Sequence, residues 1–212
     1  MTKISQTPTH ATAGRVLHAA QLYDLLAFVF TRGRERKLRD RMIQLARLDS
    51  GNTVLDVGCG TGTLAIAAKE RVGSEGAVFG IDASPAMVAK GTRKTARAGV
   101  DVTFTNAVVE ALPFPDARFD VVLSALMLHH LPRPARRQCA AEIRRVLKPR
   151  GRLLVVDFGR PQARNGILAH LHRHGHVDFA DVGAMLIDAG FAITEDGPVG
   201  FSSLQFVLAS TP

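Results

Sequence analysis

The stretch Thr53-Val-Leu-Asp-Val-Gly-Cys-Gly-Thr-Gly62 decides the fold of this chain. Its first five residues are mostly apolar and β-branched, which is typical of a buried strand. Glycines then follow at alternate positions, 58, 60 and 62, and a helix-forming run begins at Leu64. Strand, glycine turn and helix together predict the opening unit of a nucleotide-binding α/β fold, in which the glycines let the backbone turn sharply and approach a ligand closely.

Two aspartates flank the glycine turn. Asp56 lies just before it, and Asp82 follows a second apolar run, 77–81. Asp82 lies about twenty residues beyond the glycines, which is the spacing of an acid that binds ribose hydroxyls. The turn contains no lysine or arginine and lacks the spacing of a triphosphate-binding loop. Asp56 would repel a pyrophosphate but suits a ligand with an amino group and a sulfonium, which favours S-adenosylmethionine.

Five motifs resemble those of the class I (Rossmann-like) methyltransferases, in particular the small bacterial group similar to the ubiquinone/menaquinone-biosynthesis methyltransferases. They are 54–62, 80–84, 112–116, 119–122 and 147–154, in the family's order. The resemblance implies S-adenosyl-L-methionine as cofactor. It also implies an α/β, Rossmann-like methyltransferase fold, with a seven-stranded, mostly parallel sheet, helices on both faces and an antiparallel last strand.

The resemblance further implies where the cofactor lies. Met87 is expected near the adenine, although a methionine on an apolar helix face could equally be core. Relatives often carry an acid where Val108 stands, so this position is expected to offer only backbone and apolar contact. Cys59 is better explained by packing than by catalysis. The expected cofactor-binding residues are Asp56, Gly58, Cys59, Gly60, Gly62, Asp82, Ala83, Met87, Val108, Val109, Ser124, Ala125 and Leu126.

No catalytic residue is identified by the sequence. Methyl transfer mainly requires that a nucleophile be held in line with the methyl group, and a base is needed only for a poorly acidic hydroxyl or a carbon acid. The candidates are His129 and His130 after a predicted strand, Asp157 at the end of another, and Tyr23, which resembles part of a Tyr-Asp pair in the family. In relatives such a histidine often only closes a helix start, and Tyr23 could be a packing residue.

The order of the predicted elements gives one domain overall, with three parts. Residues 1–13 are expected to be a disordered tail, 14–48 an N-terminal helical cap, and 49–212 the Rossmann-like core. The cap is expected to hold two helices, 14–30 and 34–48, and to act as a lid over the acceptor pocket. The second helix is expected to carry its apolar residues on one face: Leu38, Met42, Leu45 and Leu48. Beyond the glycine turn, helices are expected over 85–98, 134–146 and 179–189, and strands over 100–105, 119–125, 152–158, 191–194 and 204–209. The first of these helices is expected to begin with Ser84 as its N-cap and Pro85 at its first position, and to stop at Gly99.

The charge of the chain leaves several partners open. A net charge of +8 admits nucleic acid or an anionic membrane surface. The basic residues are scattered, however, and the dense run 32–41 is better explained as a solvated helix face. Nucleic acid is therefore disfavoured as a partner, whereas peripheral membrane contact and a homodimer stay open. No signal peptide or spanning segment is predicted, so a cytoplasmic enzyme is expected.

No metal is expected as a cofactor. The histidines at 170, 172, 174 and 176 alternate, but no carboxylate or cysteine accompanies them at ligand spacing. The two cysteines, Cys59 and Cys139, suggest neither a disulfide framework nor a zinc site, and they are too few for an arsenite-methylating enzyme.

The sequence thus predicts transfer of a methyl group to oxygen, nitrogen or carbon of a small, apolar or aromatic metabolite. Two alternatives remain open. A nucleic-acid or protein methyltransferase is favoured by the net charge, and a cofactor-binding module without catalysis is favoured by the missing acid at Val108.

Overall fold

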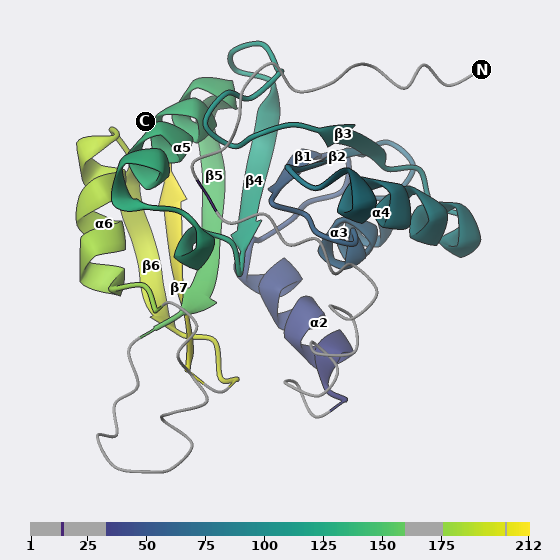
Figure 1. Cartoon of the computed structure of the whole chain (residues 1–212), viewed down its shortest axis with the longest axis horizontal. Coiled ribbons are helices and arrows are strands. Elements are labelled where there is room, and N and C mark those ends of the chain that lie inside the picture. The colour runs from purple at the N-terminus through teal and green to yellow at the C-terminus, as the bar shows by residue number, and fades with distance from the viewer. Residues whose placement is uncertain (1–13, 15–32, 160–175, 202) are drawn as a thin grey trace.

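The structure is a computed structural model that describes residues 14, 33–159, 176–201 and 203–212 (Figure 1). Within these residues, seven strands form one sheet in the order β3-β2-β1-β4-β5-β7-β6. The strands are β1 (Thr53–Val57), β2 (Ala77–Asp82), β3 (Thr103–Asn106), β4 (Phe119–Ala125), β5 (Leu147–Phe158), β6 (Ala192–Pro198) and β7 (Leu204–Ser210). The helices are α2 (Glu35–Leu45), α3 (Thr63–Val72), α4 (Pro85–Ala98), the 3-10 helix η1 (Leu128–His130), α5 (Arg133–Val146) and α6 (Phe179–Asp188).

The strand pairing confirms the predicted fold class. β1 pairs in parallel with β2 and β4, and the outer pairs β2–β3 and β4–β5 are also parallel. β7 lies between β5 and β6 and is antiparallel to both. The sheet is therefore mostly parallel with an antiparallel last strand. The order of strands reverses at β1 and β4, which is the point where open α/β sheets bind ligands.

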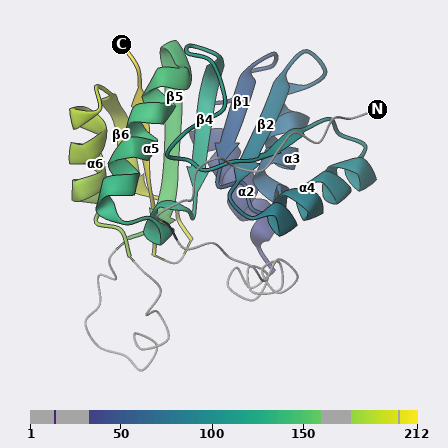
Figure 2. The same ribbon diagram turned by 45° about the horizontal axis from the view of Figure 1, so that its top comes forward.

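Helices cover both faces of the sheet, α5 and α6 on one face and α2, α3 and α4 on the other (Figure 2). Alternate residues of each central strand supply the two cores. In β1, Leu55 and Val57 pack in the core beneath α5 and α6, whereas Val54 packs in the core beneath α2 and α3. The central strands are apolar on both sides because both of their faces are covered.

Helix α4 has the ends that the sequence predicted, but its first turn is not held by the predicted hydrogen bond. It begins at Pro85 after Ser84 and ends at Gly99, which has a left-handed backbone (φ +67°), as predicted. The Ser84 hydroxyl, however, makes no capping hydrogen bond. Instead the Ser84 N–H donates to Asp82 Oδ1 at 2.8 Å, so a neighbouring carboxylate orders the chain where the sequence predicted a serine cap.

Several boundaries differ from prediction. β5 starts at Leu147 instead of residue 152, because the expected turn stays paired with β4 across an irregularity in the register. β6 extends to Pro198 for a similar reason, with a register shift after Ile193. β3 starts only at Thr103. These differences lie at element ends and leave the topology unchanged.

The part of the cap that the structure describes is α2, with Leu38, Met42 and Leu45 buried as the helical pattern predicted. The expected tail 1–13, the cap residues 15–32 with Tyr23, and the histidines at 170, 172 and 174 lie outside the described residues. Among the residues that are described, no helix has the length and apolar character needed to cross a membrane.

Candidate functional site

The glycine turn lies at the carboxyl edge of the sheet, between β1 and α3. Gly58, Gly60 and Gly62 all have left-handed backbones, with φ of +68°, +53° and +75°. L-residues rarely adopt this conformation, so the turn depends on glycine at each of these positions. The predicted strand, turn and helix are therefore confirmed in their local geometry.

Two of these glycines also leave room for neighbouring side chains. A Cβ on Gly58 would collide with the side chain of Met127. A Cβ on Gly62 would lie 2.5 Å from the Phe104 ring, and Cβ atoms on Gly80 and Gly91 would also crowd this ring, at 2.7 and 3.1 Å. Phe104 thus sits in a socket made by glycines of the turn, β2 and α4. The sequence pattern assigned Gly58 and Gly62 to a ligand, and the structure adds a packing role that spacing could not show.

The Phe104 socket predicts that two matched glycine variants differ in their free energy of unfolding. Gly62→Ala places a methyl group against the ring, while Gly99→Ala meets an equally left-handed backbone with no heavy atom within 4 Å. Backbone strain of about 1–2 kcal/mol applies to both variants, and crowding adds about 1–3 kcal/mol to Gly62→Ala alone. Urea unfolding should therefore show Gly62→Ala to be the less stable variant. Equal losses in the two would mean that the ring moves aside freely.

Asp82 joins the glycine turn to the start of α4. Its Oδ2 accepts from the Gly60 N–H at 2.9 Å and its Oδ1 from the Ser84 N–H at 2.8 Å. The Asn106 side chain donates to the Asp82 carbonyl at 2.8 Å. Burial raises the pKa of the Asp82 carboxyl, and the two backbone hydrogen bonds oppose that rise. Each carboxylate oxygen keeps a lone pair with which it could accept a ligand hydroxyl.

Asp56 is a second carboxyl group beside the turn, and it is 2% exposed. Burial, and then the charge of Asp82, raise the pKa of Asp56 to about 8, although a hydrogen bond from the Ala65 N–H at the start of α3 opposes the rise. Its Oδ2 atom has no hydrogen-bond partner among the described residues. A buried, unpartnered carboxyl oxygen is costly for a fold, so it indicates a site that a cationic or hydrogen-bonding ligand completes.

Cys59 is explained by packing, as the sequence suggested. Its Sγ would lie 3.0 Å from a Cβ on Gly80, so the thiol fills space that the β2 glycine leaves. Burial and the charges of Asp56 and Asp82 raise the pKa of the Cys59 thiol well above its usual range. A protonated thiol is a poor nucleophile, so Cys59 is not suited to covalent chemistry.

The residues expected at the adenine lie apart from the main cores. Met87 on α4 and Val108 after β3 are 2% and 6% exposed, yet neither belongs to the two hydrophobic clusters of the sheet faces. Val109, in contrast, packs in the core beneath α5 and α6. Its side chain is therefore structural, and only its backbone could serve a ligand.

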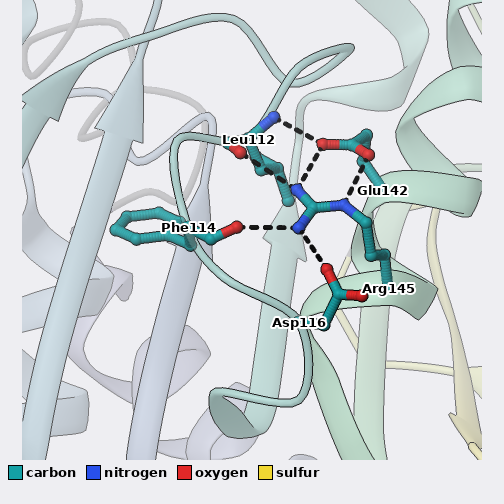
Figure 3. Close-up of polar contacts among 5 residues, drawn as sticks. All are labelled: Leu112, Phe114, Asp116, Glu142 and Arg145. Atoms are coloured by element: carbon teal, nitrogen blue, oxygen red, sulfur yellow. Dashed lines mark hydrogen bonds and ion pairs between the residues drawn. The ribbon is translucent and has the colours of Figure 1, made fainter.

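The segment between β3 and β4, which carries Val108 and Val109, is held by the end of α5 (Figure 3). The Arg145 guanidinium donates to the carbonyls of Leu112 and Phe114 at 3.0 and 2.8 Å and to the carboxylates of Asp116 and Glu142. Glu142 in turn accepts from the Leu112 N–H at 2.7 Å. We name this set, Leu112, Phe114, Asp116, Glu142 and Arg145, the Arg145 clamp. It fixes a segment that has no regular hydrogen bonding of its own.

The Arg145 clamp predicts a specific loss of order. Arg145→Met should lower the free energy of unfolding by about 2 kcal/mol, because the guanidinium is one-third exposed and its ion pairs are partly screened. The Leu112 amide should also exchange its hydrogen faster in native-state exchange measurements. Arg137→Met, an exposed arginine of the same helix, is the control. Equal effects in both variants would contradict the clamp.

At the end of β4 the chain leaves the sheet through a strained residue. Leu126 has φ +55°, which is unfavourable for a side chain of this size, and its N–H donates to the Val156 carbonyl at 2.8 Å. Ser124 is 2% exposed, and its hydroxyl has no partner among the described residues. Strain and an unpartnered hydroxyl at one strand end are typical of a functional site.

The sequence candidates His129 and Asp157 are brought together next to this strand end. His129 Nδ1 lies 2.6 Å from Asp157 Oδ1, and the His129 N–H donates to Asp157 Oδ2 at 3.1 Å. The His130 ring centroid lies 3.9 Å from that of His129, and Phe158 contacts His129 edge-on. Sequence reasoning named both groups but missed the pairing, because 28 residues separate them.

His176, the one alternating histidine within the described residues, lies next to Val177, whose N–H donates to the Phe158 carbonyl. No group of three or more His, Cys, Asp or Glu side chains in the described part of the chain is placed to hold a metal ion.

Comparison with known proteins fits this geometry. Residues 54–151, from β1 into β5, match the family described as "Methyltransferase domain". The chain is 37% identical over 152 residues to the ubiquinone/menaquinone biosynthesis C-methyltransferase UbiE of Marinomonas sp. (strain MWYL1), and 38% identical over 143 residues to the demethylmenaquinone methyltransferase of Thermus thermophilus. These matches support a class I S-adenosylmethionine-dependent methyltransferase. These alignments cover 70% and 67% of this chain but only 60% and 63% of the two relatives.

Solved structures confirm the methyltransferase fold. An S-adenosylmethionine-dependent methyltransferase from Aquifex aeolicus superposes with a TM-score of 0.76 at 24% identity, over 92% of this chain and all of that one. The [4+2]-cyclase SpnF superposes with a TM-score of 0.74 at 20% identity, over 95% of this chain and 99% of that one. At these identities the likeness concerns the fold alone, and a protein named as a cyclase shares it.

Proposed function

We propose that this chain is an S-adenosyl-L-methionine-dependent methyltransferase that acts on a small quinone-type metabolite. One observation carries the proposal: two carboxyl groups meet at the glycine turn, one tied to the turn and one buried with an unpartnered oxygen. Asp82 bonds Gly60 N–H, and Asp56 retains a free Oδ2 among the described residues. The match of residues 54–151 to a methyltransferase domain and the likeness to UbiE support the same conclusion.

The residues at the carboxyl edge fit this cofactor. In the proposal Asp82 accepts the ribose hydroxyls, and Asp56 faces the cationic amino group of the methionine moiety. The adenine lies near Met87 and the backbone of Val108 and Val109. The methionine moiety lies along Ser124, Ala125 and Leu126, while Gly58, Cys59, Gly60, Gly62 and Ala83 form the surrounding backbone. When bound, the cofactor supplies the activated methyl group.

The acceptor class comes from the relatives' names. UbiE is named as a C-methyltransferase of ubiquinone and menaquinone biosynthesis, and the Thermus protein as a demethylmenaquinone methyltransferase. For transfer to carbon, the ring carbon must be electron-rich to attack the methyl group, so the reduced quinol is the form that would react. In the proposed cap, 14–48, α2 packs on the core, 49–212, and the part before α2 would close over the acceptor and shield this reaction from water. Tyr23, His129, His130 and Asp157 are the candidates for contact with the acceptor.

A cofactor-binding module without catalysis is the second candidate, and Val108 is the observation that favours it. An apolar residue where relatives often carry an acid leaves the adenine amino group without a side-chain acceptor. The fold alone does not decide between a methyltransferase and a module that only binds the cofactor, because a protein named as a cyclase has the same fold.

Calorimetry followed by a transfer assay tests the proposal. S-adenosylmethionine should bind more tightly than NAD or ATP, and methyl-labelled cofactor should label short-chain demethylmenaquinol, detected by mass spectrometry. Tighter binding of NAD or ATP would overturn the assignment of S-adenosylmethionine as the cofactor. Cofactor binding without labelling of the quinol or of any extracted metabolite would favour the module. Labelling of RNA or protein instead would establish the alternative of a macromolecular methyltransferase.

The proposed enzyme is cytoplasmic. A homodimer and peripheral membrane contact are further parts of the proposal, and sedimentation and vesicle flotation test them directly.

A further inference from the structure

Asp157 at the end of β5 is fully buried, with 0% exposure, and takes part in three close polar contacts. The Phe158 N–H donates to its Oδ1 at 2.7 Å, and the His129 N–H donates to its Oδ2 at 3.1 Å. The third contact, at 2.6 Å, joins its Oδ1 to His129 Nδ1. Asp157 therefore fixes both the backbone and the ring of His129.

This contact determines which nitrogen of His129 is basic. A carboxylate can only accept, so Nδ1 must carry the hydrogen in the shared bond. In the neutral ring the lone pair then lies on Nε2, which is the arrangement that a buried aspartate imposes on the histidine of a hydrolase triad.

The pair lies beside the glycine turn. Met127, two residues before His129, occupies the space that a Cβ on Gly58 would need. Leu126 bonds β5 at Val156, so η1 is held over the adjoining ends of β4 and β5. The His129 side chain, which is 7% exposed, therefore adjoins the edge proposed for the cofactor.

We propose that His129, oriented by Asp157, is the general base of this enzyme. The inference rests on the proposed function and narrows its acceptor to a carbon acid or hydroxyl that must lose a proton. As the acceptor gains a bond to the methyl carbon, the acceptor's proton passes to His129 Nε2. The electron pair of the broken carbon–sulfur bond stays on sulfur. The proton then leaves to solvent, so charge and atoms balance.

Other charged and titratable groups of the adjoining elements could affect this ring. His130 of η1 stacks near it, and Arg136 of α5 donates to the carbonyls of Leu128 and Leu131 and interacts with Asp157. A purely structural pair, which only closes η1 onto β5, is the competing explanation. It requires the same hydrogen bonds and therefore the same tautomer, so the kcat values and the pH profiles of the variants separate the two explanations.

The first test needs neither cofactor nor acceptor. Nitrogen NMR of histidine-labelled protein should show His129 as the Nδ1–H tautomer, with assignment by comparison with His129→Gln. In Asp157→Asn the amide can donate to Nδ1, which moves the hydrogen to Nε2. Wild-type protein with the hydrogen on Nε2 would overturn the proposal.

The second test uses the full chain with S-adenosylmethionine and short-chain demethylmenaquinol. His129→Gln should lower kcat about 100-fold or more and leave the calorimetric affinity for the cofactor within about threefold. Asp157→Asn should lower kcat at least tenfold, and both variants should lose the acid limb of the wild-type pH profile. If folded His129→Gln retains that limb, the assignment of His129 as the base is wrong. A larger loss of kcat in the matched variant His130→Gln would also overturn it.

Failure of this inference differs from failure of the proposed function. If His129 is not the base, His129→Gln still binds the cofactor and methylates the quinol. If the proposed function is wrong, the wild-type protein itself does not bind the cofactor or does not methylate the quinol.

Discussion

Asp82→Ala is expected to weaken S-adenosylmethionine binding at least 100-fold in calorimetry. In the proposed complex the carboxylate accepts two ribose hydroxyls, and charge-assisted hydrogen bonds of this kind contribute about 1.5–3 kcal/mol each. The same carboxylate accepts from the Gly60 and Ser84 N–H groups, so its removal also loosens the glycine turn from the start of α4. Ligand contact and preorganisation are therefore lost together.

Two controls separate these causes. Asp120 accepts from the Thr53 N–H and from Lys148 at the opposite end of β4, so Asp120→Ala removes a comparable carboxylate far from the turn and should keep cofactor affinity. A 2′-deoxy analogue of S-adenosylhomocysteine tests the ribose contact itself. Wild-type protein should bind it more weakly than the parent compound, and Asp82→Ala should barely distinguish the two. Wild-type affinity in Asp82→Ala would remove the ribose assignment.

The fold was predictable because its signals are local. The glycine turn follows its strand directly, Pro85 and Gly99 mark the two ends of α4, and alternate apolar residues fill the central strands. Each of these features needs fewer than about fifteen consecutive residues to recognise. The antiparallel position of β7 was different, because it came from the family resemblance and pattern alone showed only two closing strands.

The site was less predictable because its contacts join distant segments. Arg145 meets Leu112 about thirty residues away, and Phe104 meets glycines of three different elements. The pairing of His129 with Asp157 is of the same kind. Sequence spacing identified which residue types were present, but it could not show which of them touch or which carboxyl oxygen is left without a partner.

Ser84 shows the same limit on a smaller scale. Its position before Pro85 correctly marks the start of α4, yet the carboxylate of Asp82, and not the serine hydroxyl, orders the local backbone. Helix propensity and position predicted the boundary, whereas the hydrogen-bond donor and acceptor depended on where β2 ends in space.

Asp56→Asn is expected to change how stability depends on pH. The pKa of Asp56 rises from 3.8 to about 8 on folding, through burial and the charge of Asp82. The folded protein therefore holds a proton that the unfolded chain has released between about pH 4 and pH 8. The contribution of Asp56 to stability therefore falls as pH rises through this window, by up to about 1.4 kcal/mol per pH unit.

Asparagine removes this titration and keeps an oxygen for the Ala65 N–H. Urea unfolding of Asp56→Asn from pH 5 to pH 8 should show a flatter profile than wild type, and by pH 8 the variant should be the more stable protein by at least about 1 kcal/mol. A smaller slope of the same sign should persist, because burial raises the pKa of Asp82 as well. Parallel profiles for the two proteins would contradict the buried-carboxyl explanation.

Asp56→Asn should be the more stable protein but should bind the cofactor more weakly, because the cofactor's amino group needs the ionised carboxylate. A cation beside Asp56 lowers its pKa again, so binding at pH 7 should release close to one proton from the wild-type protein. Calorimetry in buffers of different ionisation enthalpy measures this number, and affinity should rise from pH 6 to pH 7.5. Asp56→Asn should release almost none and bind at least tenfold more weakly. Equal proton release by both proteins would place the amino group away from Asp56.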